Sequence, residues 1–171
     1  FSSIDNLCNK LKVEYIIKRS NLGELIFNIR KESNPCSLCS RIRKGMINNT
    51  AKAYGCNKIA LGHNMDDAIE TFLMNILNCG NISCFSPISY LSRKDIFMIR
   101  PLIFCEESKI KSFIVNHSFP IIKSTCPANG KTQRQKTKEL VSYLESDYKD
   151  FKKKIIGAIQ RSDISGWKKL F

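Results

Sequence analysis

The sequence has no long hydrophobic run. Its apolar stretches are only a few residues long, whereas a helix that crosses a membrane needs about 20 consecutive apolar residues. The start of the chain also lacks the basic segment followed by an apolar one that marks a secretory signal peptide. These absences predict a cytoplasmic protein without a membrane partner.

Acidic residues are scarce compared with basic ones. The 171 residues include 28 lysines and arginines but only 15 aspartates and glutamates, so the net charge is +13. Such an excess favours association with polyanions, above all with the phosphate backbone of nucleic acid. A lysine-rich composition without such a partner is the alternative, and composition alone leaves it open. The length is sufficient for one ordinary domain with its own core.

Glycine is also scarce. The chain has eight glycines, and no two of them are adjacent. A loop that wraps a phosphate group usually needs clustered glycines, because its backbone N–H groups must approach the anion closely. The sequence therefore contains no glycine-rich phosphate loop.

Cysteine, in contrast, is abundant, with eight residues. Without a signal peptide they indicate a reducing compartment, where a Cys-x-x-Cys pair such as Cys36 and Cys39 more often binds metal or takes part in catalysis. Cys126, in a later loop, is the natural third ligand, and three thiolates suit a [4Fe–4S] cluster with one open iron. Zinc would normally take a fourth ligand, which His63 and His117 have no spacing to supply. A redox pair is disfavoured because its motif would directly follow a strand, and simple packing stays open.

Hydrophobic periodicity predicts strands that alternate with helices. Such alternation is typical of an α/β fold, in which helices flank a parallel sheet. We expect an α/β domain over residues 1–130 and a basic helical segment over residues 131–171, with a hinge near residues 145–150. The expected strands are 12–19, 56–64, 96–103 and 119–124. The expected helices are 37–54, 65–78, 106–117 and 133–148 with a basic continuation, and residues 4–11 are expected to be the end of a further helix. Residues 81–95 are expected to be a loop.

The end of the second expected strand carries the most informative polar residues. Gly62 lets a ligand approach the backbone, and Asn64 is placed to cap a helix whose N-terminus attracts anions. Asp66, Asp67 and Glu70 follow within two turns and could hold Mg²⁺ beside a nucleotide. Acidic residues in a first turn also stabilise a helix through its dipole without any further function. Both interpretations stay open here.

Several segments together resemble a known family. They are PCSLCSRIRKG at residues 35–45, KIALGHNMDDAIETFLMN at 58–75, IRPLI at 99–103 and FPIIKSTCPANGKTQR at 119–134. In this order they resemble the tRNA 2-thiocytidine biosynthesis (TtcA-like) proteins of the PP-loop ATP-pyrophosphatase superfamily. The resemblance runs from about residue 12 to 161, and the joint pattern is far more specific than any single motif.

The resemblance implies a Rossmann-like sheet that binds ATP and Mg²⁺, and an enzyme that adenylates the C2 oxygen of cytidine at tRNA position 32. Sulfur from a persulfide carrier, such as a cysteine desulfurase, then replaces that oxygen at a [4Fe–4S] cluster. A homodimer is one option for the assembly. The implied residues are Asp66 for catalysis; Gly62, His63, Asn64, Asp67 and Arg100 for cofactor binding; and Cys36, Cys39 and Cys126 for the cluster.

The sequence departs from the family at one point. The Ser-Gly-Gly-x-Asp-Ser phosphate loop is absent, and the chain begins with Phe1 rather than methionine. We therefore expect an N-terminally truncated chain that lacks its first βα unit and binds ATP poorly. The alternatives are a related PP-loop enzyme of the 2-thiouridine synthetase or lysidine synthetase type, or a non-catalytic iron–sulfur or zinc RNA-binding module.

Overall fold

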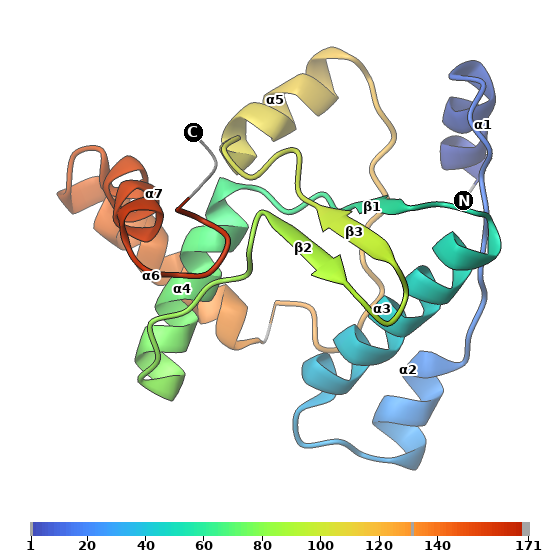
Figure 1. Cartoon of the computed structure of the whole chain (residues 1–171), viewed down its shortest axis with the longest axis horizontal. Helices are drawn as coiled ribbons and strands as arrows, with labels where there is room; N and C mark the ends of the chain where they lie inside the picture. Colours follow the sequence, from blue (N-terminus) through green and yellow to red (C-terminus); the bar gives the residue numbers. More distant parts are fainter. Residues whose placement is uncertain (1, 131, 169–171) are drawn as a thin grey trace. The chain divides into compact units, whose positions relative to one another are not determined.

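The computed structural model describes residues 2–130 and 132–168 (Figure 1). The chain divides into two compact units. One comprises residues 1–43 and 108–129 and is called the cysteine unit here, because it contains Cys36, Cys39 and Cys126. The other comprises residues 44–107 and 130–171 and is called the sheet unit. The predicted boundary between residues 130 and 131 stays a prediction.

The sheet unit contains a three-stranded sheet in the order β1-β3-β2. Strands β1 (Lys58–Ala60) and β3 (Ile96–Ile99) are parallel, as the alternating pattern predicts. Strand β2 (Ile88–Leu91) pairs antiparallel with β3. The sheet is therefore mixed rather than all parallel.

Strand β2 corrects the expectation of a loop over residues 81–95. A proline disrupts a strand when it lies within the strand, because it lacks the N–H that the ladder needs. Pro87 directly precedes β2, so its missing N–H costs no ladder hydrogen bond. A tight turn with Asp95 at φ 52° then joins β2 to β3 as a hairpin. Strands joined by so short a connection can only run antiparallel.

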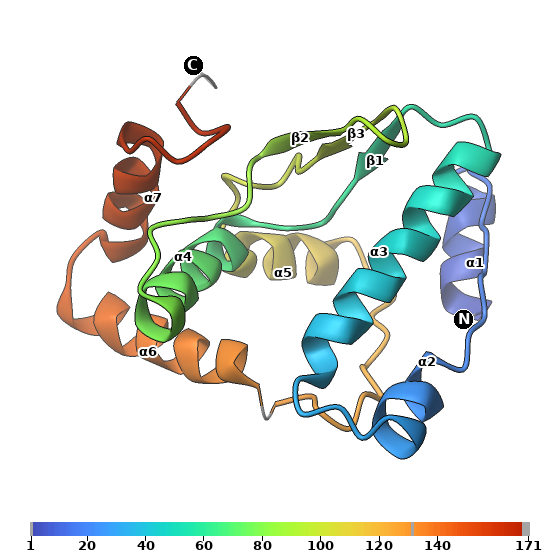
Figure 2. The same ribbon diagram turned by 60° about the horizontal axis from the view of Figure 1, so that its bottom comes forward.

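Three helices of the sheet unit build its core. Helix α4 (Met65–Cys79) contacts both α6 (Gln133–Asp147) and α7 (Phe151–Arg161) (Figure 2). Helix α6 ends at Asp147 and Asp150 adopts a left-handed φ of 57° before α7, so the helices are separated where a hinge was predicted, and the hinge itself stays a prediction. The buried cluster consists of Met65, Ala68, Ile69, Ile103, Val141, Ile156, Ile159, Ile164 and Trp167.

The cysteine unit is mainly helical. It contains α1 (Ser2–Lys10), α2 (Leu22–Glu24), which runs on into the π-helical turn η1 (Leu25–Ile29), and the first half of α3 (Pro35–Ala53). Helix α5 (Glu107–Asn116) lies almost entirely in this unit.

Two predicted strands of the cysteine unit are wrong for this structure. Residues 12–19 and 119–124 form no strand. Neither segment is paired with a strand of the described sheet, and β-forming side chains alone do not form a strand without a neighbouring ladder. No helix among the described residues has the length and apolar character needed to cross a membrane.

Candidate functional site

The turn after β1 leads directly into α4. Asn64 has extended backbone angles, and its side-chain oxygen accepts a hydrogen bond from the Asp67 N–H at 3.1 Å. The Asp67 carboxylate accepts in return from the Asn64 N–H at 3.0 Å, which completes a capping box. The Met65 N–H donates to the Cys105 carbonyl at 2.9 Å. The predicted cap is confirmed, and it engages Asp67 in holding the helix end.

Asp66 is buried beneath this turn. Its exposed fraction is 8%, and one carboxylate oxygen accepts from the Glu107 N–H at 2.7 Å. The other oxygen lies 2.9 Å from the Lys152 ammonium on α7, which also contacts Glu145 at 2.7 Å. Burial alone would raise the pKa of Asp66, but these two donors outweigh it and hold the pKa below its ordinary value. Asp66 is therefore an ionised carboxylate tied to α7.

Glu70 lies one turn further along α4 and is also buried, with an exposed fraction of 4%. Its carboxylate contacts the Arg134 guanidinium at 2.9 Å, and Arg134 also donates to the Thr71 hydroxyl at 3.0 Å. The same guanidinium lies 3.5 Å from Asp67. Burial raises the pKa of Glu70, and the attraction of Arg134 offsets only part of this effect. This contact ties α6 to α4.

Arg100, which is buried, and His63, which is partly buried, form a second group beside the turn. The Arg100 Nε donates to His63 Nδ1 at 3.3 Å, and Nη1 donates to the Ser86 carbonyl. The guanidinium lies 4.7 Å from the centre of the Phe85 ring, which also packs against the imidazole at 5.0 Å. Burial lowers the pKa of His63, and Arg100 lowers it further, while Asp67 opposes them. His63 is therefore neutral near pH 7, which allows its Nδ1 to accept the hydrogen bond from Arg100.

The acidic residues of α4 do not converge on one point. Asp66 pairs with Lys152, and Glu70 and Asp67 face Arg134. Among the described residues, no three histidine, cysteine or carboxylate side chains are grouped as a metal site. Sequence reasoning missed the role of Lys152, because α7 is far along the chain and a lysine in a lysine-rich helix carries no local signal of its partner.

The three predicted cluster cysteines all lie in the cysteine unit as free thiols. Cys36 and Cys39 stand in the first turns of α3, where a spacing of three places both on one helix face. Cys126 begins a turn closed by the Asn129 N–H, which donates to its carbonyl at 3.0 Å. Cys36 and Cys126 are exposed and Cys39 is partly buried. The donor set suits a cluster with three protein ligands, although the three thiols are not grouped at ligand distances within residues 2–130 and 132–168.

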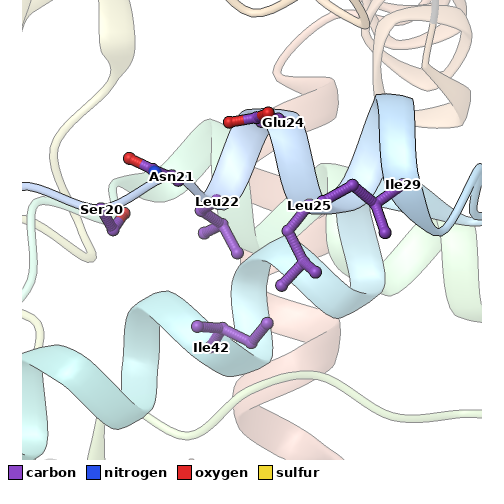
Figure 3. Close-up of a pocket in the computed structure, with 7 residues that line it drawn as sticks. All are labelled: Ser20, Asn21, Leu22, Glu24, Leu25, Ile29 and Ile42. Carbon is purple, nitrogen blue, oxygen red and sulfur yellow. The ribbon is translucent and has the colours of Figure 1, made fainter.

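A cavity of about 500 Å³ opens in the cysteine unit (Figure 3). It lies between α2, η1 and α3, and Leu22, Leu25 and Ile42 form its apolar wall. Glu24 is the charged residue of its lining. An apolar cavity with an acidic residue suits neither a triphosphate nor an RNA backbone, and none of the predicted site residues lines it.

Comparison with known proteins decides the family. The family model described as the PP-loop domain matches residues 2–139. The chain belongs to the PP-loop domain family. It is 39% identical over 132 residues to the tRNA-cytidine(32) 2-sulfurtransferase of Citrifermentans bemidjiense. This match covers 76% of this chain and 52% of that protein. The protein of the same name from Geotalea uraniireducens is 35% identical, in a match that covers 86% of this chain and 59% of that protein. The one from Ralstonia pickettii is 40% identical, in a match that covers 81% of this chain and 44% of that protein.

The PP-loop chain also resembles a solved structure. It is similar to the U34-tRNA thiolase NcsA from Methanococcus maripaludis with its [4Fe-4S] cluster, with a TM-score of 0.74 and 25% sequence identity. The match covers 94% of this chain and 54% of the thiolase chain. The Rossmann-like fold expected from the sequence is thereby confirmed. The chain spans about half the length of the relatives that it matches.

Proposed function

We propose that this chain is part of an ATP-dependent tRNA thiolation enzyme that converts cytidine at position 32 into 2-thiocytidine. The observation that carries the proposal is the identity of 35–40% to tRNA-cytidine(32) 2-sulfurtransferases over three quarters or more of the chain. The net charge of +13 suits a tRNA substrate. The roles of the individual residues are part of the same proposal.

The proposed reaction has two steps. The C2 oxygen of the cytidine attacks the α-phosphate of ATP, and pyrophosphate leaves. Sulfur at the sulfide level then adds to C2, and AMP leaves with the former C2 oxygen, so that C=S replaces C=O. Adenylation is required because the unmodified oxygen is a poor leaving group. A persulfide carrier, such as a cysteine desulfurase, supplies the sulfur, and a thiol reductant brings it to the sulfide level.

The nucleotide is proposed to lie at the turn formed by Gly62, His63 and Asn64, beyond the carboxyl end of β1, where open α/β sheets bind ligands. Arg100 offers a cation beside this turn and is already oriented by His63. Asp66 is the proposed catalytic or Mg²⁺-binding carboxylate. Both of its oxygens are engaged in the present structure, so the Lys152 ammonium has to give way before a cation can bind Asp66.

The proposed sulfur site consists of Cys36, Cys39 and Cys126. A [4Fe–4S] cluster bound there would supply an open iron coordination site for the incoming sulfur. The support is the donor set itself, together with the similarity to a tRNA thiolase that carries such a cluster. The three side chains must converge within the cysteine unit when the cluster binds.

The test is nucleoside mass spectrometry of tRNA from a strain in which the gene is deleted and then restored. We expect 2-thiocytidine to disappear and to return with the wild-type gene but not with a Cys39→Ser variant. An unchanged level of 2-thiocytidine in the deletion strain would contradict the proposal.

One observation favours a second candidate. The similar solved structure is that of a U34-tRNA thiolase, so a 2-thiouridine product at position 34 is the alternative. The same digest separates the two, because 2-thiouridine derivatives and 2-thiocytidine differ in mass and retention. Loss of the former with retention of the latter would favour the alternative.

A further inference from the structure

The two faces of the small sheet differ in burial. Side chains alternate between the faces of a sheet, so residues paired across strands share a face. On one face, Ile96 and Met98 of β3 are buried, with exposed fractions of 0% and 3%. On the other face, Ile88, Tyr90 and Phe97 are exposed by 50%, 53% and 44%. We call this second surface the open face, and Figure 2 shows the three strands that form it.

Two aromatic side chains stand next to each other at the centre of the open face. The register pairs Tyr90 of β2 with Phe97 of β3, and Phe97 in turn with Lys58 of β1. The two ring centres are 4.9 Å apart, with an angle of 37° between the rings. The Tyr90 hydroxyl donates to Asp95 at 3.0 Å, which fixes the ring orientation. The rings form a small, ordered apolar platform.

The charge around the platform is positive. Lys58 stands in the same row, and the hairpin turn adds Arg93 and Lys94. Asp95 is the acidic residue of these strands and their turn, and it is engaged by Tyr90. An exposed aromatic pair with basic residues in the same strands and turn is the combination with which sheets bind unpaired nucleotides, because the bases stack on the rings and the phosphates meet the cations.

We propose that the open face binds unpaired nucleotides of RNA, with bases stacked on Tyr90 and Phe97 and phosphates near Lys58 and the hairpin turn. The inference rests on the proposed tRNA substrate and adds a contact to nucleotides other than the one that reacts. Stacking favours unpaired bases, because the faces of bases in a duplex are already covered by their neighbours. A partner protein would not need the surrounding cations.

The test measures RNA binding rather than thiolation. A fluorescein-labelled RNA stem-loop and a blunt RNA duplex of equal length are titrated with the full chain by fluorescence anisotropy. Tyr90→Leu and Phe97→Leu remove a ring but keep an apolar strand residue. Each is expected to weaken stem-loop binding by about 5- to 150-fold, the range that corresponds to loss of one stacked base. Duplex binding should change little.

Tyr143→Leu is the matched control, because Tyr143 is an even more exposed aromatic residue (63%) but lies on α6. It should leave stem-loop binding unchanged. Stem-loop affinity that is unaltered by both ring deletions, in variants with the wild-type circular dichroism spectrum, overturns the proposal. A change in oligomeric state by sedimentation with unaltered RNA affinity also overturns it, and assigns the face to a contact between copies.

Ultraviolet crosslinking of the wild-type chain to the stem-loop gives a second readout that does not depend on variants. Crosslinked peptides from residues 88–99 are expected, and crosslinks confined to other segments contradict the proposal. Both readouts are independent of the product, so a failed thiolation assay with intact stem-loop binding would reject the proposed reaction and leave this inference standing.

Discussion

The two units of the chain differ in how their side chains are held. In the sheet unit, a buried cluster built on α4, α6 and α7 holds Trp167 at 1% exposure, and the buried carboxylates of Asp66 and Glu70 pair with Lys152 and Arg134. Among the described residues of the cysteine unit, Ile26 is the one buried hydrophobic residue, while Ile29 and Ile121 are about 70% exposed. The sheet unit is therefore stabilised by its own core, whereas the cysteine unit has little core to stabilise it.

The difference has a functional meaning under the proposed function. Segments with few buried apolar contacts open at low free energy, and ligand-binding elements are often of this kind. Binding of a cluster by Cys36, Cys39 and Cys126 would supply the missing stabilisation, since a metal that binds only the folded form adds its binding free energy to folding. The sheet unit needs no such contribution.

The largest expected effect concerns the cluster. Replacement of Cys36, Cys39 or Cys126 by serine should abolish the brown visible absorbance and the iron content of anaerobically reconstituted protein, because each removes one of three thiolate ligands. In the wild type, reconstitution should slow limited proteolysis within residues 1–43 and leave the sheet unit unchanged.

Cys56 provides the matched control, because it is an exposed free thiol outside the cysteine unit. Cys56→Ser should keep both absorbance and iron. A colourless protein with one equivalent of zinc would contradict the cluster assignment and replace it with a zinc site.

Trp167→Ala is expected to have the next largest effect, on the sheet unit alone. The side chain packs edge-on against Phe104 at 6.2 Å, and its indole N–H donates to the Phe85 carbonyl at 3.1 Å. Loss of a buried tryptophan costs about 3–5 kcal/mol. Urea unfolding measures the change, and Tyr143→Ala, at an exposed position, should shift the free energy of unfolding by no more than about 0.5 kcal/mol. Equal effects of the two variants would contradict a core centred on Trp167.

Lys152→Met tests the buried pair with Asp66. The substitution removes the Lys152 ammonium, so that the Asp66 carboxylate keeps the hydrogen bond from the Glu107 N–H but loses its ion pair. Loss of one partner of a buried ion pair lowers the free energy of unfolding by roughly 3 kcal/mol. Lys153→Met is the control, because Lys153 pairs with Asp150 on the surface at 3.2 Å and should cost less than about 0.5 kcal/mol. A second substitution, Asp66→Asn, should recover much of the loss.

The same pair predicts a dependence of stability on pH. The folded pKa of Asp66 is lower than the ordinary value of 3.8, so its ionisation stabilises the fold above pH 3.8. This contribution is lost as the pH falls through the folded pKa. The difference in unfolding free energy between wild type and Lys152→Met should therefore shrink in acid, and a difference that grows in acid would contradict the assignment.

The contrast between the units also explains which elements the sequence predicted. Helix α4 was predicted over residues 65–78 with its cap at Asn64, because the cap and the helical periodicity are local signals. The strand expected at residues 12–19 was wrong, because strand formation depends on a neighbour that local propensity does not report. The contact between Asp66 and Lys152 joins residues far apart in sequence, so only the fold reveals it.

Asn64→Ala tests the local signal with a smaller effect. It removes the acceptor of the Asp67 N–H at the start of α4 and should lower the free energy of unfolding by about 1 kcal/mol. Asn78→Ala, at an exposed position of the same helix, should be neutral or slightly stabilising, because alanine has the higher helix propensity. Equal losses in both variants would show that the cap contributes nothing specific.

Two glycines give the smallest effects, and the effects should have opposite signs. Gly80 ends α4 at φ 61°, so Gly80→Ala should cost about 1 kcal/mol through backbone strain alone, since no atom lies within 4 Å of the added methyl group. Gly45 lies inside α3, also with free space around it, and Gly45→Ala should add about 0.5–1 kcal/mol. Helix α3 runs from the cysteine unit into the sheet unit. In the Gly45→Ala variant, hydrogen exchange should therefore become slower in both halves of α3. Slower exchange only after residue 45 would mean that the two halves of this helix open independently.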